Sequence, residues 1–251
     1  MKTHKLISTL FIIAFFSALS SYSYGKNLSF SSSEARTSLI ELYTSEGCSS
    51  CPPADQWLSK LKNNKNLWSS VVPIAFHVDY WDYLGWKDEF ANPQFTERQY
   101  IYQKLKYLST VYTPGVMKNG REWRGWRWWQ SPNSRNKEKA GILSATANQE
   151  NLSVTYTNFI QSPSDLVLNI ALLGMNIHSR IQSGENAGKI LVHDFVVLDF
   201  QQHIMTKSTN GAMLAISNPI HSFPNKTDAI AIWVNTKNDP TPLQATGSWV
   251  N

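Results

Sequence analysis

The stretch Glu41-Leu-Tyr-Thr-Ser-Glu-Gly-Cys48-Ser-Ser-Cys51-Pro-Pro-Ala-Asp55 holds the only two cysteines of the 251-residue chain. A short apolar run at 38–43 precedes it, and a run with helical spacing follows it. A strand, a Cys-x-x-Cys turn and a helix are together typical of a redox site, because the turn presents one thiol and buries the other. We therefore expect catalytic chemistry at Cys48, as the attacking thiolate, and at Cys51, as the resolving thiol.

Two other uses of the cysteine pair compete with catalysis: a structural disulfide and a metal site. A structural disulfide that closes a four-residue loop adds only about 2 kcal/mol, against about 4.7 kcal/mol for a hundred-residue loop. A zinc site needs more ligands, and the sequence has no second Cys-x-x-Cys. A soft three-ligand site for copper(I), made of Cys48, Cys51 and His77, stays open as an alternative.

The N-terminus predicts a periplasmic or secreted protein. Lys2 and Lys5 form a basic segment, an apolar run follows at 6–19, and the pattern is that of a signal peptide at 1–25. The apolar run is shorter than the roughly 20 residues that a membrane span requires, so no span is expected in the mature chain. Removal of the two lysines lowers the formal net charge from +5 to +3, which favours no particular partner. The serine-rich segment 26–36 is expected to be a flexible leader.

The residues after the cysteines predict a helix and then a second strand. Pro52 and Pro53 have no N–H to donate, so the helix is expected to begin at Pro52 with Cys51 as its cap. His77 and Asp79 lie at the end of the strand predicted within 70–79, beside the expected site. Either side chain is a candidate for the proton transfer that activates Cys51. The structural alternatives are a buried, hydrogen-bonded histidine and an aspartate in a turn.

The stretch Val111-Tyr-Thr113-Pro114-Gly-Val-Met-Lys-Asn119-Gly120 predicts a strand and a tight turn, because Asn-Gly favours two-residue hairpins. The same stretch resembles the cis-proline loop and the following hairpin of thioredoxins. That resemblance implies that Pro114 is cis and packs against the cysteine pair. It also implies that Thr113 and Pro114 bind an extended substrate.

Four blocks in combination resemble a narrower group, a family of secreted thioredoxin-like proteins catalogued as domain of unknown function 1223. The resemblance covers roughly residues 38–200 and implies a fold more than an activity. Two positions depart from ordinary thioredoxins: Gly47 replaces a tryptophan, and Ser49-Ser50 replace Gly-Pro, which leaves the redox potential and the substrate open. The blocks are Glu41 to Asp55, His77-Val-Asp-Tyr-Trp-Asp-Tyr-Leu-Gly-Trp-Lys-Asp88, Val111-Tyr-Thr-Pro114, and Ser183-Gly-Glu-Asn-Ala-Gly-Lys189 with His193.

The second half of the chain has a different pattern. From residue 141 the apolar residues alternate with period two, and 142–147 and 152–157 predict a hairpin. The polar segment 131–140 is the expected linker to an all-β, sandwich-like domain at 141–251. The predicted fold class is therefore an α/β thioredoxin-like domain at 37–130, a mixed sheet with flanking helices, followed by that sandwich.

Together these features predict a thiol–disulfide oxidoreductase that acts on protein thiols or disulfides, or with a redox partner protein, and needs no cofactor. One alternative is a copper(I) chaperone that uses the cysteines with His77. Another is a non-enzymatic binding protein on a thioredoxin scaffold, which would use the tryptophan-rich stretch 122–130. Tryptophans interleaved with arginines also suit single-stranded nucleic acid, but the signal peptide argues against a nucleic-acid partner.

Overall fold

The computed structural model describes residues 27–132, 138–157, 165–222 and 227–250. Within these ranges the chain is mostly β-strand, with two α-helices, α1 (Pro52–Ser59) and α2 (Pro93–Lys104). None of the helices in the described part of the chain could span a membrane. The signal peptide predicted at 1–25 and the middle of the predicted linker lie outside the described residues.

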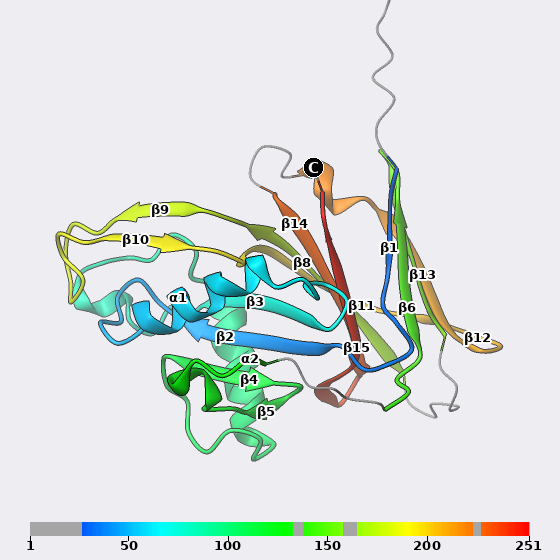
Figure 1. The fold of residues 1–251 in the computed structure, drawn as a ribbon, viewed down its shortest axis with the longest axis horizontal. Helices are drawn as coiled ribbons and strands as arrows, with labels where there is room; N and C mark the ends of the chain where they lie inside the picture. Colours follow the sequence, from blue (N-terminus) through cyan, green and yellow to red (C-terminus); the bar gives the residue numbers. More distant parts are fainter. Residues whose placement is uncertain (1–26, 133–137, 158–164, 223–226, 251) are drawn as a thin grey trace, which may run out of the picture.

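One mixed sheet of eight strands forms the centre of the described structure (Figure 1). Its middle strands run parallel to one another, and the remaining pairs are antiparallel. In spatial order the strands are β15 (Asp239–Trp249), β14 (Ala229–Thr236), β8 (Leu166–Gly174), β11 (Val196–Ile204), β3 (Val71–His77), β2 (Ser38–Thr44), β4 (Gly115–Lys118) and β5 (Arg121–Glu122).

The predicted fold class, an α/β thioredoxin-like domain followed by a separate all-β domain, is wrong. The structure is predominantly β, with large sheets and only two α-helices among the described residues. Strand β11 pairs in parallel with β3 through Val196 and Ala75, so strands from both sides of the predicted linker complete a single sheet. Local apolar patterns reveal strands but not their distant partners, and this pairing joins positions more than a hundred residues apart.

The two α-helices cover opposite faces of the β2–β3 region (Figure 1). Both strands are buried along their whole length, as expected for strands covered on both faces. On the α2 side, the rings of Phe76 and Phe95 pack with their centroids 4.8 Å apart. Because side chains alternate along a strand, the neighbouring His77 faces the α1 side. This alternation separates an aromatic core from the polar cluster described below.

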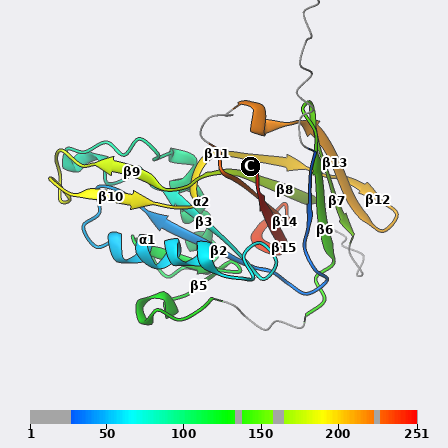
Figure 2. The ribbon, with the colours of Figure 1, turned by 45° about the horizontal axis from the view of Figure 1, so that its top comes forward.

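A second sheet packs against the β8–β14 part of the large sheet (Figure 2). Apolar side chains from both sheets form the shared core, including Val154 and Tyr156 from one sheet and Ile170 and Ile232 from the other. The order of strands is β1 (Leu28–Ser31), β6 (Ile142–Ala147), β7 (Asn151–Thr157), β13 (Gly211–Ser217) and β12 (Thr206–Ser208). The hairpin predicted at 142–157 is confirmed, because β6 and β7 in this sheet pair antiparallel.

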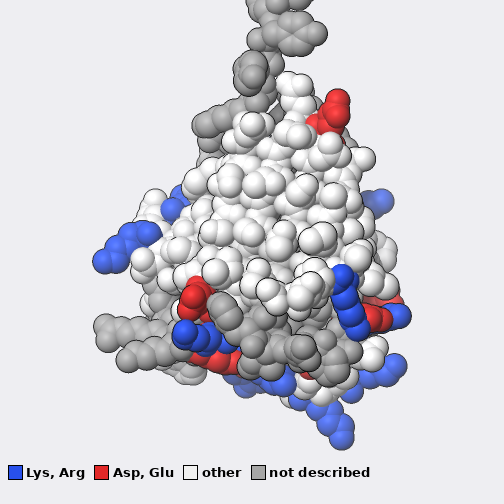
Figure 3. Space-filling view, turned by 90° about the vertical axis from the view of Figure 1, so that its right-hand side faces the viewer, with Lys and Arg blue, Asp and Glu red and all other residues white. Residues whose placement is uncertain are grey.

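The outer face of this five-stranded sheet is uncharged at its centre. Figure 3 shows that the centre of this side of the molecule carries no Lys, Arg, Asp or Glu. Small hydroxyl side chains such as Thr146, Ser153 and Thr155 alternate there with buried apolar residues. The predicted flexible leader at 26–36 instead contains β1, which completes the edge of the sheet by pairing with β6.

A two-stranded arm extends the β8–β11 hairpin beyond the large sheet (Figure 1). It consists of β9 (Ile177–Arg180) and β10 (Ile190–His193), which pair antiparallel. The tip of the arm, residues 181–189, is closed by backbone hydrogen bonds between Ile181 and Lys189 and between Gly188 and Ile181. The arm lies beside α1, and its tip contacts the cysteine turn.

Candidate redox site

The two cysteines form a disulfide in the turn between β2 and α1. Cys51 is the N-cap of α1 and the helix begins at Pro52, as predicted. Cys48 and Cys51 are only 1% and 0% exposed, whereas Ser49 and Ser50 between them face solvent. The pair therefore sits at the carboxyl end of a central strand, just beneath the surface.

Two further segments border the turn. Pro114 precedes β4, and because Gly115 pairs with Tyr43, it lies at the end of β2 that leads into the cysteines. The Thr113–Pro114 peptide is cis, which confirms that prediction. Trp81 is the second neighbour and connects the cis-proline loop to the cysteine turn. Its Nε1 donates to Thr113 Oγ1 over 2.7 Å, and its Cβ lies against Gly47.

The tip of the arm holds the turn from the other side. Asn186 is fully buried, and its Nδ2 donates to the carbonyls of Glu46 (2.8 Å) and Cys48 (3.0 Å). The Ser49 amide donates to Glu185 Oε2 over 3.0 Å. The Ser183 hydroxyl donates to the carbonyl of Gly85 and anchors the tip to the neighbouring loop.

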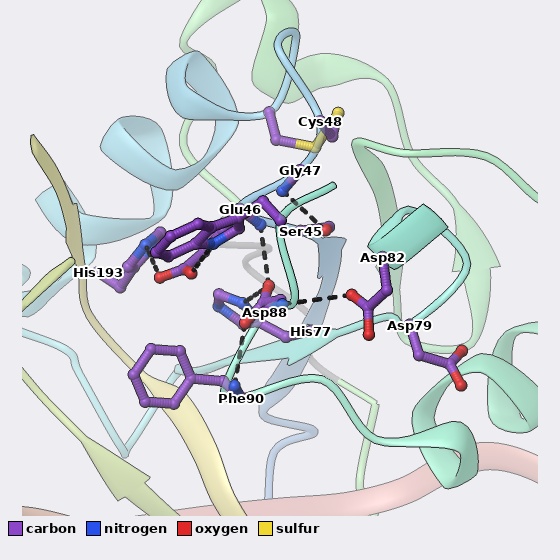
Figure 4. Close-up of polar contacts among 12 residues, drawn as sticks. Ser45, Glu46, Gly47, Cys48, His77, Asp79, Asp82, Asp88, Phe90 and His193 are labelled. Atoms are coloured by element: carbon purple, nitrogen blue, oxygen red, sulfur yellow. Dashed lines mark hydrogen bonds and ion pairs between the residues drawn. A yellow bond between two sulfur atoms is a disulfide. The ribbon is translucent and has the colours of Figure 1, made fainter. Parts of the chain in front are cut away.

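Five buried ionisable side chains from five different segments form a cluster. Figure 4 shows Glu46, His77, Asp88 and His193 beneath the disulfide. His77 Nδ1 lies 2.7 Å from Asp88 Oδ2, and His193 Nε2 lies 3.4 Å from Glu46 Oε1. The rings of the two histidines have centroids 5.0 Å apart. Asp55, one helical turn after Cys51, completes the buried cluster. We call these residues, Glu46, Asp55, His77, Asp88 and His193, the buried cluster.

Mutual contacts shift the pKa values within this buried cluster. Burial alone lowers the pKa of His77, but the charge and hydrogen bond of Asp88 outweigh it and raise that pKa above 6.5. Burial raises the pKa of Asp88, yet His77 brings it below 3.8. The pKa of Asp55 is raised because burial outweighs the attraction of His193 and His77. The pKa of Glu46 is lowered, because bonds with His193, Ser179 and Trp86 overcome the effect of burial.

The His77–Asp88 pair predicts a stability that depends on pH. A raised pKa of His77 gives stability that is complete below 6.5 and is lost as pH rises through the raised value. A lowered pKa of Asp88 gives stability that is present above 3.8 and is lost as pH falls through the lowered value. We expect Asp88→Asn to reduce the free energy of unfolding by about 2 kcal/mol between these limits and by less outside them.

Urea unfolding at about pH 3, 5.5 and 9 measures this difference. Asp79→Asn is the matched control, because Asp79 is only partly buried and accepts a hydrogen bond from Thr96 outside the buried cluster. A loss for Asp88→Asn that is equal at all three pH values would contradict the ion pair.

A family model described as a protein of unknown function (DUF1223) matches residues 39–235. The chain belongs to the DUF1223 family. The matched region of this DUF1223 protein includes both cysteines, the arm and the whole buried cluster. No protein with a curated description matches the chain.

Two solved structures resemble this DUF1223 protein. A crystal structure of a protein from Agrobacterium tumefaciens has a TM-score of 0.67 and 26% identity, covering 87% of this chain and 96% of that one. HBP35 of Porphyromonas gingivalis has a TM-score of 0.56 and 12% identity, covering 86% of this chain and 76% of that one. At 12% identity the second similarity concerns the fold alone.

The structure brings together some of the predicted site residues of this DUF1223 protein. His77 lies in the buried cluster, and Thr113 and Pro114 border the cysteine turn. Asp79 points away from the buried cluster toward α2, where its Oδ1 accepts from Thr96 Oγ1 over 2.6 Å (Figure 4). Its predicted role in proton transfer therefore has no geometric support, whereas the role of His77 stays a prediction.

Sequence reasoning missed most of the residues that surround the disulfide. Glu46 and Asp55 belong to the quoted cysteine block, but neither was predicted to be a catalytic residue. Asn186 and His193 belong to the fourth block, whose position beside the cysteines depends on the pairing of β11 with β3. The available signal for their involvement was their place in a block that resembles the family, since 183–193 holds only one Asn, one Glu and one His.

The copper(I) alternative gains no support from this geometry. Cys48 and Cys51 bond to each other, and His77 Nδ1 faces Asp88. Among the described residues, no group of three or more His, Cys, Asp or Glu side chains is arranged to hold a metal ion. Copper binding through Cys48, Cys51 and His77 stays a prediction.

The tryptophan-rich stretch packs on α1 at a distance from the cysteine turn along that helix. Residues Gly125–Trp128 form a 3-10 helix, and Trp123 packs on Trp57 with ring centroids 5.4 Å apart. Trp128 and Trp129 are 69% and 49% exposed, and Lys60 Nζ lies 3.8 Å from the ring of Trp129. Part of this stretch therefore supports α1, whereas Arg124 and residues 127–130 face solvent.

Proposed function

We propose that this protein is a thiol–disulfide oxidoreductase that acts on protein thiols and disulfides through Cys48 and Cys51. The observation that carries the proposal is a disulfide at a helix start, between the only two cysteines of the chain, above a buried ionisable cluster. A four-residue disulfide loop contributes little to stability, so a structural purpose accounts for it poorly. The predicted signal peptide supports action in the periplasm or outside the cell, where disulfides persist.

The proposed reaction exchanges one disulfide for another. A substrate thiolate attacks Cys48 Sγ, the Sγ–Sγ bond breaks, and its electron pair leaves on Cys51 Sγ. The second thiol of the substrate then attacks the mixed disulfide and releases the oxidised substrate and a Cys48–Cys51 dithiol. In the reverse direction Cys48 attacks a substrate disulfide and Cys51 resolves it. No electrons enter or leave other than those of the two sulfur pairs.

The buried cluster supports this chemistry because a buried thiolate needs a proton close by. Cys51 is fully buried, so its thiolate is strongly destabilised after the Sγ–Sγ bond breaks. Asp55 is one helical turn away, and its raised pKa favours the protonated form that can donate. Among the described residues, His77 Nε2 has no hydrogen-bond partner, so it is available to replace that proton.

Turnover of a protein disulfide tests the proposal. The reduced protein, isolated free of small thiols, is incubated with insulin, and a stoichiometric excess of dithiothreitol sustains the reaction. We expect insulin to be reduced faster than by dithiothreitol alone, and reduced ribonuclease to be oxidised by the disulfide form. Rates equal to the background in both directions would refute the proposed function.

A further inference from the structure

We propose that Asn186 is a positioning residue that fixes the backbone of the cysteine turn and sets the equilibrium between disulfide and dithiol. This inference rests on the proposed function and adds a determinant that lies 138 residues from Cys48 in the sequence. Among the described residues, the hydrogen bonds of the Asn186 side chain go to backbone carbonyls and to Lys189, not to either sulfur. It acts through the carbonyls of Glu46 and Cys48.

The side chain of Asn186 is itself held in one orientation. It is 0% exposed, and Lys189 Nζ donates to its Oδ1 over 2.8 Å. Its amide nitrogen uses both N–H donors on two carbonyls and its oxygen accepts from a lysine, so these bonds fix the orientation of the amide. Gly188, with a φ of +81°, allows the tip to turn back so that Asn186 is presented to the cysteine turn.

The carbonyl of Cys48 is the centre of the turn. It also accepts from the amide of Cys51 over 3.2 Å, so one carbonyl group links Asn186 to both cysteine residues. In the disulfide form the covalent bond already closes the turn. In the dithiol form that bond is gone, and the contacts of Asn186 remain to hold the two thiols close to each other.

Loss of these contacts should therefore affect the two redox states unequally. The dithiol gains more freedom than the disulfide, so the effective concentration of one thiol near the other falls. A lower effective concentration makes the disulfide less stable relative to the dithiol. The reduction potential should then become less negative, as it does for more labile disulfides.

The test is the equilibrium of the full chain with glutathione buffers, in which one oxidised glutathione becomes two reduced ones as the dithiol is oxidised. The fraction of protein in each form is read after thiol alkylation by mass spectrometry. We expect Asn186→Ala to shift the equilibrium constant about tenfold toward the dithiol, which corresponds to about 30 mV. Asn186→Asp keeps the size and the acceptor for Lys189 but loses the donor, and it should shift the equilibrium in the same direction.

Ser183→Ala is the matched control, because it removes an anchor of the same tip without touching the cysteine turn. A shift for both Asn186 variants and an unchanged equilibrium for Ser183→Ala supports the inference. An unchanged equilibrium for the Asn186 variants, or equal shifts in all three, overturns it; Asn186→Asp decides if the alanine variant does not fold. The equilibrium is measured on the protein itself, so a wild type that titrates normally but does not turn over insulin refutes only the proposed function.

Discussion

Cys48→Ser should abolish the exchange of protein disulfides, with a loss of at least about a thousandfold in turnover, as expected when the nucleophile of an enzyme is removed. Cys51→Ser should lose turnover to the same extent for a different reason. Its Cys48 thiolate can still attack, but no resolving thiol remains to release the substrate. This variant should therefore accumulate a mixed disulfide that a non-reducing gel detects.

The two variants distinguish the roles of the two cysteines. A mixed disulfide should form with Cys51→Ser and should be absent with Cys48→Ser. The opposite result would exchange the assigned roles, and trapping by neither variant would remove Cys48 as the attacking thiolate. Ser183→Ala is a suitable control, because the Ser183 hydroxyl donates to the carbonyl of Gly85 rather than to either sulfur.

Arg98→Leu should lower the free energy of unfolding by about 3–5 kcal/mol, because it leaves a buried carboxylate without its counter-ion. Arg98 Nε donates to Glu41 Oε2 over 2.7 Å, and both side chains are almost completely buried. The hydroxyls of Tyr43 and Tyr102 also donate to Glu41. The guanidinium lies among the rings of Phe76, Tyr102, Phe200 and Trp233.

Denaturant unfolding at neutral pH measures this loss, and two further variants interpret it. The double variant Glu41→Gln, Arg98→Met removes both charges and should recover part of the stability. Arg36→Met breaks a more exposed pair with Glu138 and should change the stability by about 0.5 kcal/mol. Equal losses for Arg98→Leu and the double variant would show that packing, rather than the unpaired charge, accounts for the effect.

Local features of the fold could be predicted from the sequence because each depends on neighbouring residues. The cap at Cys51 follows from two prolines, and the β4–β5 turn follows from Asn119-Gly120, both of which adopt positive φ. The central architecture could not be predicted in this way. The pairing of Val196 with Ala75 depends on which strand edges meet, and an apolar strand sequence does not specify that.

In the candidate site, too, residues within short motifs could be predicted and residues that depend on distant contacts could not. Cys48, Cys51 and Pro114 were found because short motifs mark them. Asp88 escaped notice although it follows His77 by only eleven residues, because an aspartate after an aromatic loop equally suits a turn. His193 could be placed only once the arm was known to lie beside α1.

The place of the arm in the sequence also determines when the cysteine turn acquires its contacts during synthesis. A ribosome makes Cys48 and Cys51 well before it makes Asn186, which lies 138 positions beyond Cys48, and β11, which returns the arm to the large sheet, is made later still. Until those segments arrive, the new chain carries its two thiols without the cover that later encloses them. An oxidant or a thiol reagent that meets the emerging chain thus encounters more accessible cysteines than one that meets the finished protein.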